Sequence, residues 1–279
     1  MTMSKELVIP PRPDVLIEVQ KLIKSDDLEL STLSKLIKQD VSLFSVLMSA
    51  VNSPWLGLPQ KVENIETAVS LMGQLKVVNL LQAILVRACF KESPLQQSFW
   101  DSSTEVASIS DNLAKQYGIL NAEHAYTTGM LHNTGIAIMH SNFDKFTNFM
   151  ETASHHSIDR LCVMERQEFN TDHFLQGALL AKSWYMPSQV AQAIRYQPIA
   201  QSILTGKKEI GDKPTALLAI LTLAKNISND YRNYWNIQED EFQLKSMNAA
   251  LDYLDIHKNE FNEYKEDMVE NLMSDDEAA

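Results

Sequence analysis

The stretch LKVVNLLQAILVRACF, residues 75–90, indicates the fold class of this chain. Its apolar residues fall on nearly every face of a helix, and a helix that is apolar all round is usually buried. We therefore interpret it as a buried central helix that joins two lobes. No stretch is expected to span a membrane, because the longest clean apolar run, near residues 216–224, is far shorter than the roughly 20 residues that cross a bilayer.

Helical periodicity continues on both sides of this stretch. Upstream, Asn64 is a candidate N-terminal cap, and Gly73 lies where the glycine that ends a helix is expected. Downstream, Pro94 interrupts the chain before a long helix that Gly118 ends. The other helices are expected at residues 15–23, 33–37, 43–51, 122–139, 143–153, 160–168, 172–185, 188–196, 215–233, 238–256 and 257–272, with Thr171 and Ser188 as caps. Because no strand pair and no internal repeat is found, the expected fold is all-α.

The composition of the 279 residues excludes several classes of function. A hydrophobic fraction of 45% is enough to build a core, and eight glycines argue against a glycine-rich cofactor loop. The formal net charge of −12 argues against a nucleic-acid-binding face and against a polybasic membrane patch. Cys89 and Cys162 are the only cysteines, and they do not form a Cys-x-x-Cys pair, which predicts a reducing, cytoplasmic location.

The two ends of the sequence carry no further motif. Residues 1–14 lack the apolar core of a signal peptide. Residues 259–279 contain eight acidic residues and one lysine, so the negative charge is concentrated at this end. We interpret this segment as a solvated helix with a frayed tail, and the alternative is an element that steers a basic partner.

A series of short motifs gives the chain a recognisable order. Each motif is weak alone, but the ordered set is specific. The motifs are Ile9-Pro10-Pro11-Arg12-Pro13, Gln39-Asp40-Val41, Ala50-Val51-Asn52-Ser53-Pro54, Ile65-Glu66-Thr67-Ala68-Val69 with Gly73, Phe99-Trp100-Asp101-Ser102-Ser103, Gly129-Met130-Leu131-His132-Asn133-Thr134-Gly135, Glu168-Phe169, His173, Gly177-Ala178-Leu179-Leu180, Trp184, Met186-Pro187 and Ala193-Ile194. Over about residues 7–200 this order resembles the HDOD domain, an output domain related to the HD phosphohydrolases.

The resemblance implies a fold and a role. The implied fold is an all-helical, two-lobed bundle of HDOD type, and the implied role is that of a bacterial signal-transduction or regulatory module, usually without demonstrated catalysis. We expect an N-terminal helical lobe at residues 1–93, which ends in the buried connecting helix. A degenerate HD-like lobe is expected at 94–200, and a C-terminal helical extension with the acidic tail at 201–279.

The resemblance also marks the positions of a former metal site. HD hydrolases hold one or two divalent metal ions with histidine and aspartate side chains, and the metal generates hydroxide from bound water. The corresponding positions in this chain are Ser102, His132, Asn133, His173 and Gln197. Two imidazoles and no matched carboxylate remain, so nothing offsets the charge of a dication. We interpret these positions as vestigial, with both histidines as hydrogen-bonded packing residues, and we expect no catalytic residue, no cofactor and no functional metal site.

Three hypotheses of function follow. The preferred one is a non-catalytic module that acts through a signalling or regulatory protein in trans or a small ligand in the cleft between the lobes. The second is a phosphohydrolase that uses Fe, Mn, Mg or Zn on a nucleotide or another phosphate ester. The third is nucleic-acid binding, which the charge disfavours. A small-molecule or anion pocket that reuses the old metal cavity is a further alternative. The Gly-Tyr-Pro signature of cyclic-dinucleotide phosphodiesterases, which resemble this fold, is absent.

Overall fold

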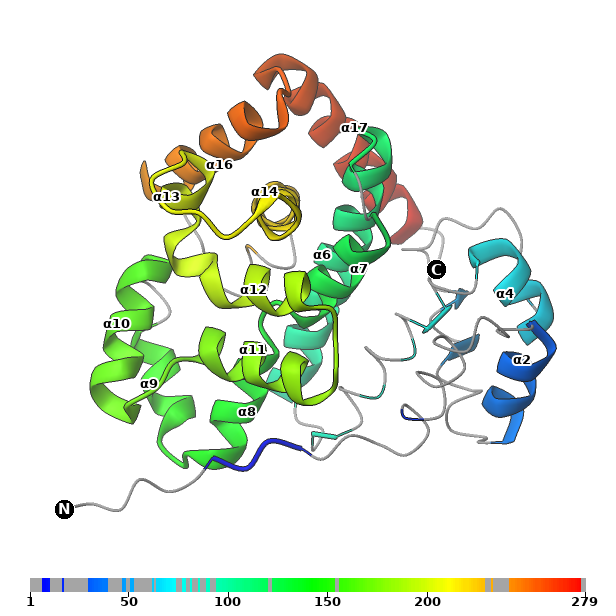
Figure 1. The fold of residues 1–279 in the computed structure, drawn as a ribbon, viewed down its shortest axis with the longest axis horizontal. Coiled ribbons are helices and arrows are strands. Elements are labelled where there is room, and N and C mark those ends of the chain that lie inside the picture. Colours follow the sequence, from blue (N-terminus) through cyan, green and yellow to red (C-terminus); the bar gives the residue numbers. More distant parts are fainter. Residues whose placement is uncertain are drawn as a thin grey trace. The chain divides into compact units, whose positions relative to one another are not determined.

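The structure is a computed structural model, and it describes residues 7–10, 17, 30–39, 47–48, 51–52, 62, 64–73, 77–78, 81, 85, 89–90, 94–119, 122–153, 156–228, 232 and 241–276. In these ranges the regular secondary structure is helical and contains no strand, so the predicted all-α fold is confirmed (Figure 1). No helix in the same ranges combines the length and the apolar character needed to cross a membrane.

The chain divides into two compact units, and each unit is built from parts that are distant in the sequence. One unit contains Met1–Pro11 and Phe90–Lys258, and the other contains Arg12–Cys89 and Asn259–Ala279. The expected two-lobed architecture is thereby confirmed. The segment boundaries expected from the sequence stay a prediction.

The unit that contains Arg12–Cys89 includes helices α2 (Leu30–Gln39) and α4 (Ile65–Met72) and nearly all of α17 (Lys258–Asp276). Helices α2 and α4 pack against each other. An ion pair joins them, with Lys38 Nζ 2.6 Å from Glu66 Oε1.

Both predicted end signals of α4 are confirmed. Asn64 is the N-cap, and its Oδ1 accepts the backbone N–H of Thr67 at 2.8 Å. Gly73 is the C-cap, and its backbone N–H donates to the carbonyl oxygen four residues back. Its φ of +79° is a conformation that glycine adopts without the steric cost that a Cβ imposes.

The described apolar residues of the stretch at 75–90 are buried, as predicted, whereas Cys89 is only partly buried. Val77, Val78, Leu81 and Leu85 are helical, and each is at most 8% exposed. The rest of the stretch, and with it the predicted connection between the lobes, lies outside the described residues. The helices expected at 15–23 and 43–51 also fall mostly outside them.

The unit that contains Phe90–Lys258 is built on two neighbouring helices, α6 (Pro94–Gln116) and α7 (Ala122–Leu131) (Figure 1). A Cβ added to Gly129 of α7 would lie 2.6 Å from Ala107 Cα of α6, so only glycine permits this close approach. Gly118 follows α6 with a φ of +59°, which confirms it as the glycine that ends this helix.

The single helix expected at 122–139 is wrong, because the structure divides it into two. Helix α7 ends at Leu131, and α8 (Thr134–Asn142) begins after a turn at His132 and Asn133. Residues on both sides of the turn are buried, so the apolar pattern runs through it without a visible break. The turn brings α8 against α11 (His173–Ser183), and the two helices pack closely together.

The remaining regular elements of this unit that the structure describes are α14 (Asp212–Ile227) and six others. The six others are α9 (Phe146–Ala153), α10 (Ile158–Phe169), α12 (Ser188–Tyr196), the 3-10 helix η2 (Gln197–Ile199), α13 (Ala200–Leu204) and α16 (Glu241–Leu254). Helix α14 packs against α6, α7, α12, α13 and α16, and most of its apolar residues are buried (Figure 1). It ends at Ile227 rather than near residue 233, because the backbone of Ser228 leaves the helical region with a ψ of 120°.

Candidate functional site

The five vestigial positions all lie in the unit that contains Phe90–Lys258, and all are buried. They come from separate elements: Ser102 from α6, His132 and Asn133 from the turn between α7 and α8, His173 from the start of α11, and Gln197 from the start of η2. Each residue is at most 5% exposed. The structure therefore places them in the interior, where every polar atom needs a hydrogen-bond partner.

The ring of His132 has a fixed orientation. Its Nδ1 lies 2.6 Å from the backbone carbonyl oxygen of Gly129 and must donate this hydrogen bond, because a carbonyl only accepts. In the neutral ring the lone pair is then on Nε2. The pKa of His132 lies well below its ordinary value, chiefly because the ring is buried and further because the charge of Lys225 is close. His132 is thus a neutral imidazole near pH 7.

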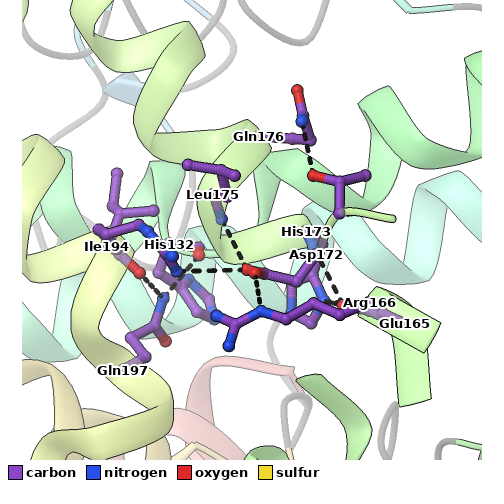
Figure 2. A network of polar contacts seen from close by, with 11 residues as sticks. His132, Glu165, Arg166, Asp172, His173, Leu175, Gln176, Ile194 and Gln197 are labelled. Carbon is purple, nitrogen blue, oxygen red and sulfur yellow. Dashed lines mark hydrogen bonds and ion pairs between the residues drawn. The ribbon is translucent and has the colours of Figure 1, made fainter. Parts of the chain in front are cut away.

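His173 is held by a carboxylate that the sequence analysis missed. Its Nδ1 lies 2.7 Å from Glu165 Oε1, and its backbone N–H donates to Glu165 Oε2 at 3.0 Å (Figure 2). Glu165 is completely buried. A signal for it was present, because Glu165 follows Leu161 by four residues and Cys162 by three and so shares their buried face of α10.

A second missed carboxylate, Asp172, caps the helix that carries His173. Asp172 Oδ1 accepts the backbone N–H of Leu175 at 2.8 Å, and its Oδ2 accepts from Arg166 Nε at 2.7 Å (Figure 2). The predicted cap Thr171 is therefore wrong by one residue. A charged carboxylate next to the first helical residue caps the N–H groups there more strongly than a hydroxyl, and the Thr171 hydroxyl accepts from Gln176 Nε2 instead, at 2.8 Å.

The second predicted cap is also displaced. Ser188 is the first residue of α12, and Pro187 occupies the cap position before it. Proline has no backbone N–H to satisfy and its fixed φ suits the start of a helix. The helix itself spans residues 188–196 as predicted.

Gln197 connects three parts of the unit. Its Nε2 donates to the carbonyl oxygen of His132 at 2.8 Å and to that of Ile194 at 3.2 Å (Figure 2). Its Oε1 accepts from Lys225 Nζ of α14 at 3.0 Å. Burial lowers the pKa of Lys225 to about 7. Lys225 is a further residue that the sequence analysis missed, although a lysine directly after the apolar run of α14 was a usable signal.

The other two vestigial positions, Ser102 and Asn133, differ in their contacts. Ser102 Oγ donates to the carbonyl oxygen of Phe99 in its own helix at 2.8 Å. Asn133 is the N-cap residue of α8, but its side chain makes no capping hydrogen bond. Figure 2 shows His132, His173 and Gln197 in one cluster with Glu165, Arg166 and Asp172, so the structure brings three of the five positions together.

Two glycines permit this cluster to form. A Cβ on Gly135 of α8 would lie 1.7 Å from the carbonyl oxygen of His173, and a Cβ on Gly177 of α11 would lie 3.2 Å from a side-chain carbon of Ile194. The backbone of α8 therefore touches the first turn of α11. This contact fixes His132, which lies just before α8, relative to His173.

The residues present do not fit a divalent metal ion. A dication needs lone pairs and negative charge from its ligands. Here Gln197 directs its N–H groups at the backbone carbonyl oxygens of His132 and Ile194 and its oxygen at an ammonium, and Lys225 adds a positive charge beside His132. Over the described residues, no three His, Cys, Asp or Glu side chains are grouped so that they could hold a metal.

A comparison with family models identifies one family. Residues 9–199 match the model of the HDOD domain. An uncharacterized protein of Treponema pallidum (strain Nichols) is 29% identical over 192 residues, which cover 67% of this chain and 37% of that protein. The chain thus spans little more than a third of the length of this relative.

Solved structures share the fold. A protein from Shewanella amazonensis SB2B, named as a candidate phosphohydrolase, has a TM-score of 0.68 at 24% identity, with 95% of this chain and 93% of that chain covered. An HDOD domain protein from Geobacter sulfurreducens has a TM-score of 0.66 at 20% identity, with 97% and 93% covered. At these identities the likeness concerns the fold alone.

Proposed function

This chain belongs to the HDOD family, and from that premise we propose that it is a non-catalytic regulatory module that acts by binding a signalling or regulatory protein in trans. The match over residues 9–199 confirms the resemblance that the motifs predicted. The observation that carries the proposal is the contact between Lys225 Nζ and Gln197 Oε1 at 3.0 Å, at a position where the resemblance implies a metal ligand in the HD hydrolases.

The physical argument is one of charge. Metal-dependent hydrolysis needs a dication that lowers the pKa of a bound water. A lysine ammonium near the same imidazole repels a dication and lowers the pKa of His132. Gln197 supplies no negative charge in return. These contacts support a structural role for the site. We therefore expect regulation to act through contacts between the surface of the module and a partner protein.

The test of the non-catalytic part measures metal and turnover together. The full chain is purified without chelator, its Fe, Mn, Mg and Zn content is measured, and it is screened against nucleotides and simple phosphate esters. We expect metal well below one equivalent per chain and no turnover above a His132→Ala variant. One equivalent of tightly held metal, with turnover lost in His132→Ala, would overturn the proposal.

The alternative is a metal-dependent phosphohydrolase, and one observation favours it. The Gly129 carbonyl holds His132 in the tautomer with its lone pair on Nε2, and metal-binding histidines are commonly fixed by a carbonyl in this way. Glu165 holds His173 in the same manner. The experiment above distinguishes the two functions because only the alternative predicts stoichiometric metal.

A partner surface is the positive part of the proposal, and Tyr185 is the first residue to test. It is 69% exposed and has a φ of +57°, a conformation that costs most residues energy and that asparagine tolerates better. Tyr185 therefore presents a large aromatic side chain at the surface, and aromatic residues are enriched at protein interfaces.

The partner test uses the full chain as bait with crosslinking and mass spectrometry. We expect the wild type to capture a signalling or regulatory protein and Tyr185→Asn to lose it while keeping its thermal stability. Val163→Ala, at a residue of α10 that is 49% exposed, is the matched control and should retain the partner. Capture of no such protein by the wild type would count against the proposal. We place the module in the cytoplasm, which the free thiols of Cys89 and Cys162 support.

A further inference from the structure

A pocket beside the Gln197–Lys225 contact lies within the unit that contains Phe90–Lys258. It has a volume of about 60 Å³ and is walled by α10, η2, α13, α14 and α16. Most of its wall is apolar, with Leu218, Leu221 and Met247 among the lining residues. Its polar groups are gathered in a few side chains, among them Gln197, Lys225 and Ser246. An apolar pocket with a few polar groups is the usual form of a small-molecule site.

The charge in this pocket selects for an anion. Lys225 is its cationic lining residue, and none of the described residues that line it is acidic. Lys225 Nζ donates to Gln197 Oε1 at 3.0 Å, at the edge of the pocket. Burial keeps the pKa of this ammonium near 7, so a bound anion would stabilise its charged form.

Ser246 gives an independent indication of a ligand. It lines the pocket from α16, it is 6% exposed, and among the described atoms its buried Oγ has no hydrogen-bond partner. Leaving a buried hydroxyl without a hydrogen-bond partner is unfavourable. A ligand with an acceptor atom in the pocket would satisfy this hydroxyl.

The size of the pocket limits the ligand. One water needs about 10–15 Å³ of such space, so the pocket holds on the order of four to six small atoms. The Lys225 ammonium and the Ser246 hydroxyl can together bind one carboxylate group. The apolar lining of the pocket can pack against a short hydrocarbon tail. A nucleotide or a large phosphate ester would not fit.

We propose that this pocket binds a short-chain monocarboxylate, with its carboxylate oxygens at Lys225 Nζ and Ser246 Oγ and its hydrocarbon tail against Leu218, Leu221 and Met247. A ligand in this pocket contacts Gln197, which lines it. The side chain of Gln197 hydrogen-bonds both Lys225 of α14 and the backbone carbonyl oxygen of His132. Use of the ligand as the input signal of the module rests on the proposed function, whereas the binding itself does not.

Calorimetry on the full chain tests the proposal with sodium butyrate as the probe. Sodium chloride at equal ionic strength sets the baseline, and butyramide and n-butylamine are isosteres without the negative charge. We expect butyrate to bind with one site per chain and the two isosteres not to bind. Three outcomes would overturn the proposal. Butyramide could bind as tightly as butyrate, inorganic phosphate could bind in place of butyrate, or butyrate could give no heat of binding over the whole titration.

Variants locate the site. Lys225→Met should weaken butyrate binding about tenfold or more, because a charge-assisted hydrogen bond is lost, and Ser246→Ala should weaken it about threefold. Lys245→Met is the matched control, since Lys245 is the exposed neighbour of Ser246 on α16 and does not line the pocket. Butyrate binding that is unchanged in Lys225→Met would place it elsewhere and overturn the proposal.

A second measurement does not depend on the folding of any variant. Butyrate titrations of the wild type in two buffers with different heats of ionisation give the number of protons taken up on binding. Because the pKa of Lys225 is about 7, about one quarter of its side chains are charged at pH 7.5 in the free protein, so we expect an uptake of about three quarters of a proton on binding. Zero uptake would contradict a carboxylate at Lys225. Loss of butyrate binding leaves the metal and partner experiments unaffected, so failure here and failure of the proposed function are distinguishable.

Discussion

Gln197 Nε2 donates to the backbone carbonyl oxygen of His132 over 2.8 Å, and this bond joins the turn between α7 and α8 to the start of η2. The same side chain accepts from Lys225 of α14 at 3.0 Å. One neutral amide thereby links three parts of the unit where the resemblance implies a metal in the HD hydrolases. A link of this kind can be measured through stability, because each of its groups is buried or partly buried.

Gln197→Leu keeps an apolar side chain of similar size and removes the whole link. The carbonyl of His132 and the ammonium of Lys225 then lose this partner, and an interior polar group that loses a partner costs about 1–3 kcal/mol. We expect the free energy of unfolding to fall by about 2–4 kcal/mol in a urea titration. Gln167→Leu, at an exposed position of α10, is the control and should change it by less than about 0.5 kcal/mol. Equal effects of the two substitutions would contradict the linking role.

Glu165→Gln tests the carboxylate that holds His173. Glu165 accepts from both the ring and the backbone N–H of His173, and a glutamine has only one acceptor oxygen and would turn its NH2 group toward one of these donors. We expect a loss of about 2–3 kcal/mol in the free energy of unfolding, measured by chemical denaturation. Glu168→Gln on the exposed face of the same helix should be nearly neutral. A loss below about 0.5 kcal/mol for Glu165→Gln would show that the pair contributes little.

The features that the sequence predicted well are those that local signals determine. The cap at Asn64 and the left-handed glycine at Gly73 depend only on residues within one turn. The bounds of α12 and the glycine that ends α6 were found for the same reason. These helix ends are therefore determined by local chemistry.

The features that the sequence did not predict depend on contacts between distant residues. The break at His132 and Asn133 arises because α8 must meet α11, and no local signal separates it from a continuous helix. The roles of Glu165 and Lys225 appear only when α10 and α14 are placed beside His173 and Gln197. A buried charge within an apolar helix face was a clue in both cases, but it did not name the partner.

Gly135→Ala tests the contact between α8 and α11. A Cβ at this position would lie 1.7 Å from the carbonyl oxygen of His173, and backbone cannot move aside as a flexible side chain can. We expect a loss of about 3 kcal/mol or more in the free energy of unfolding, or a failure to fold, seen by circular dichroism and thermal unfolding. Gly118→Ala is the control. Nothing lies within 4 Å of its Cβ position, so only the positive φ is strained and the loss should be about 1 kcal/mol.

The effect of pH tests the burial of Lys225. Burial lowers the pKa of Lys225 to about 7, whereas the ordinary value of 10.5 applies in the unfolded chain. Between these values the unfolded state binds more protons than the native state, so this residue makes the free energy of unfolding rise with pH, by at most about 1.4 kcal/mol per pH unit. Lys225→Met removes that contribution. In urea titrations, we expect the free energy of unfolding of Lys225→Met, relative to that of the wild type, to be highest near pH 7 and to fall steadily toward pH 10. For Lys245→Met, the difference from the wild type in free energy of unfolding should not change with pH. A constant difference for Lys225→Met as well would contradict a buried, charge-bearing Lys225.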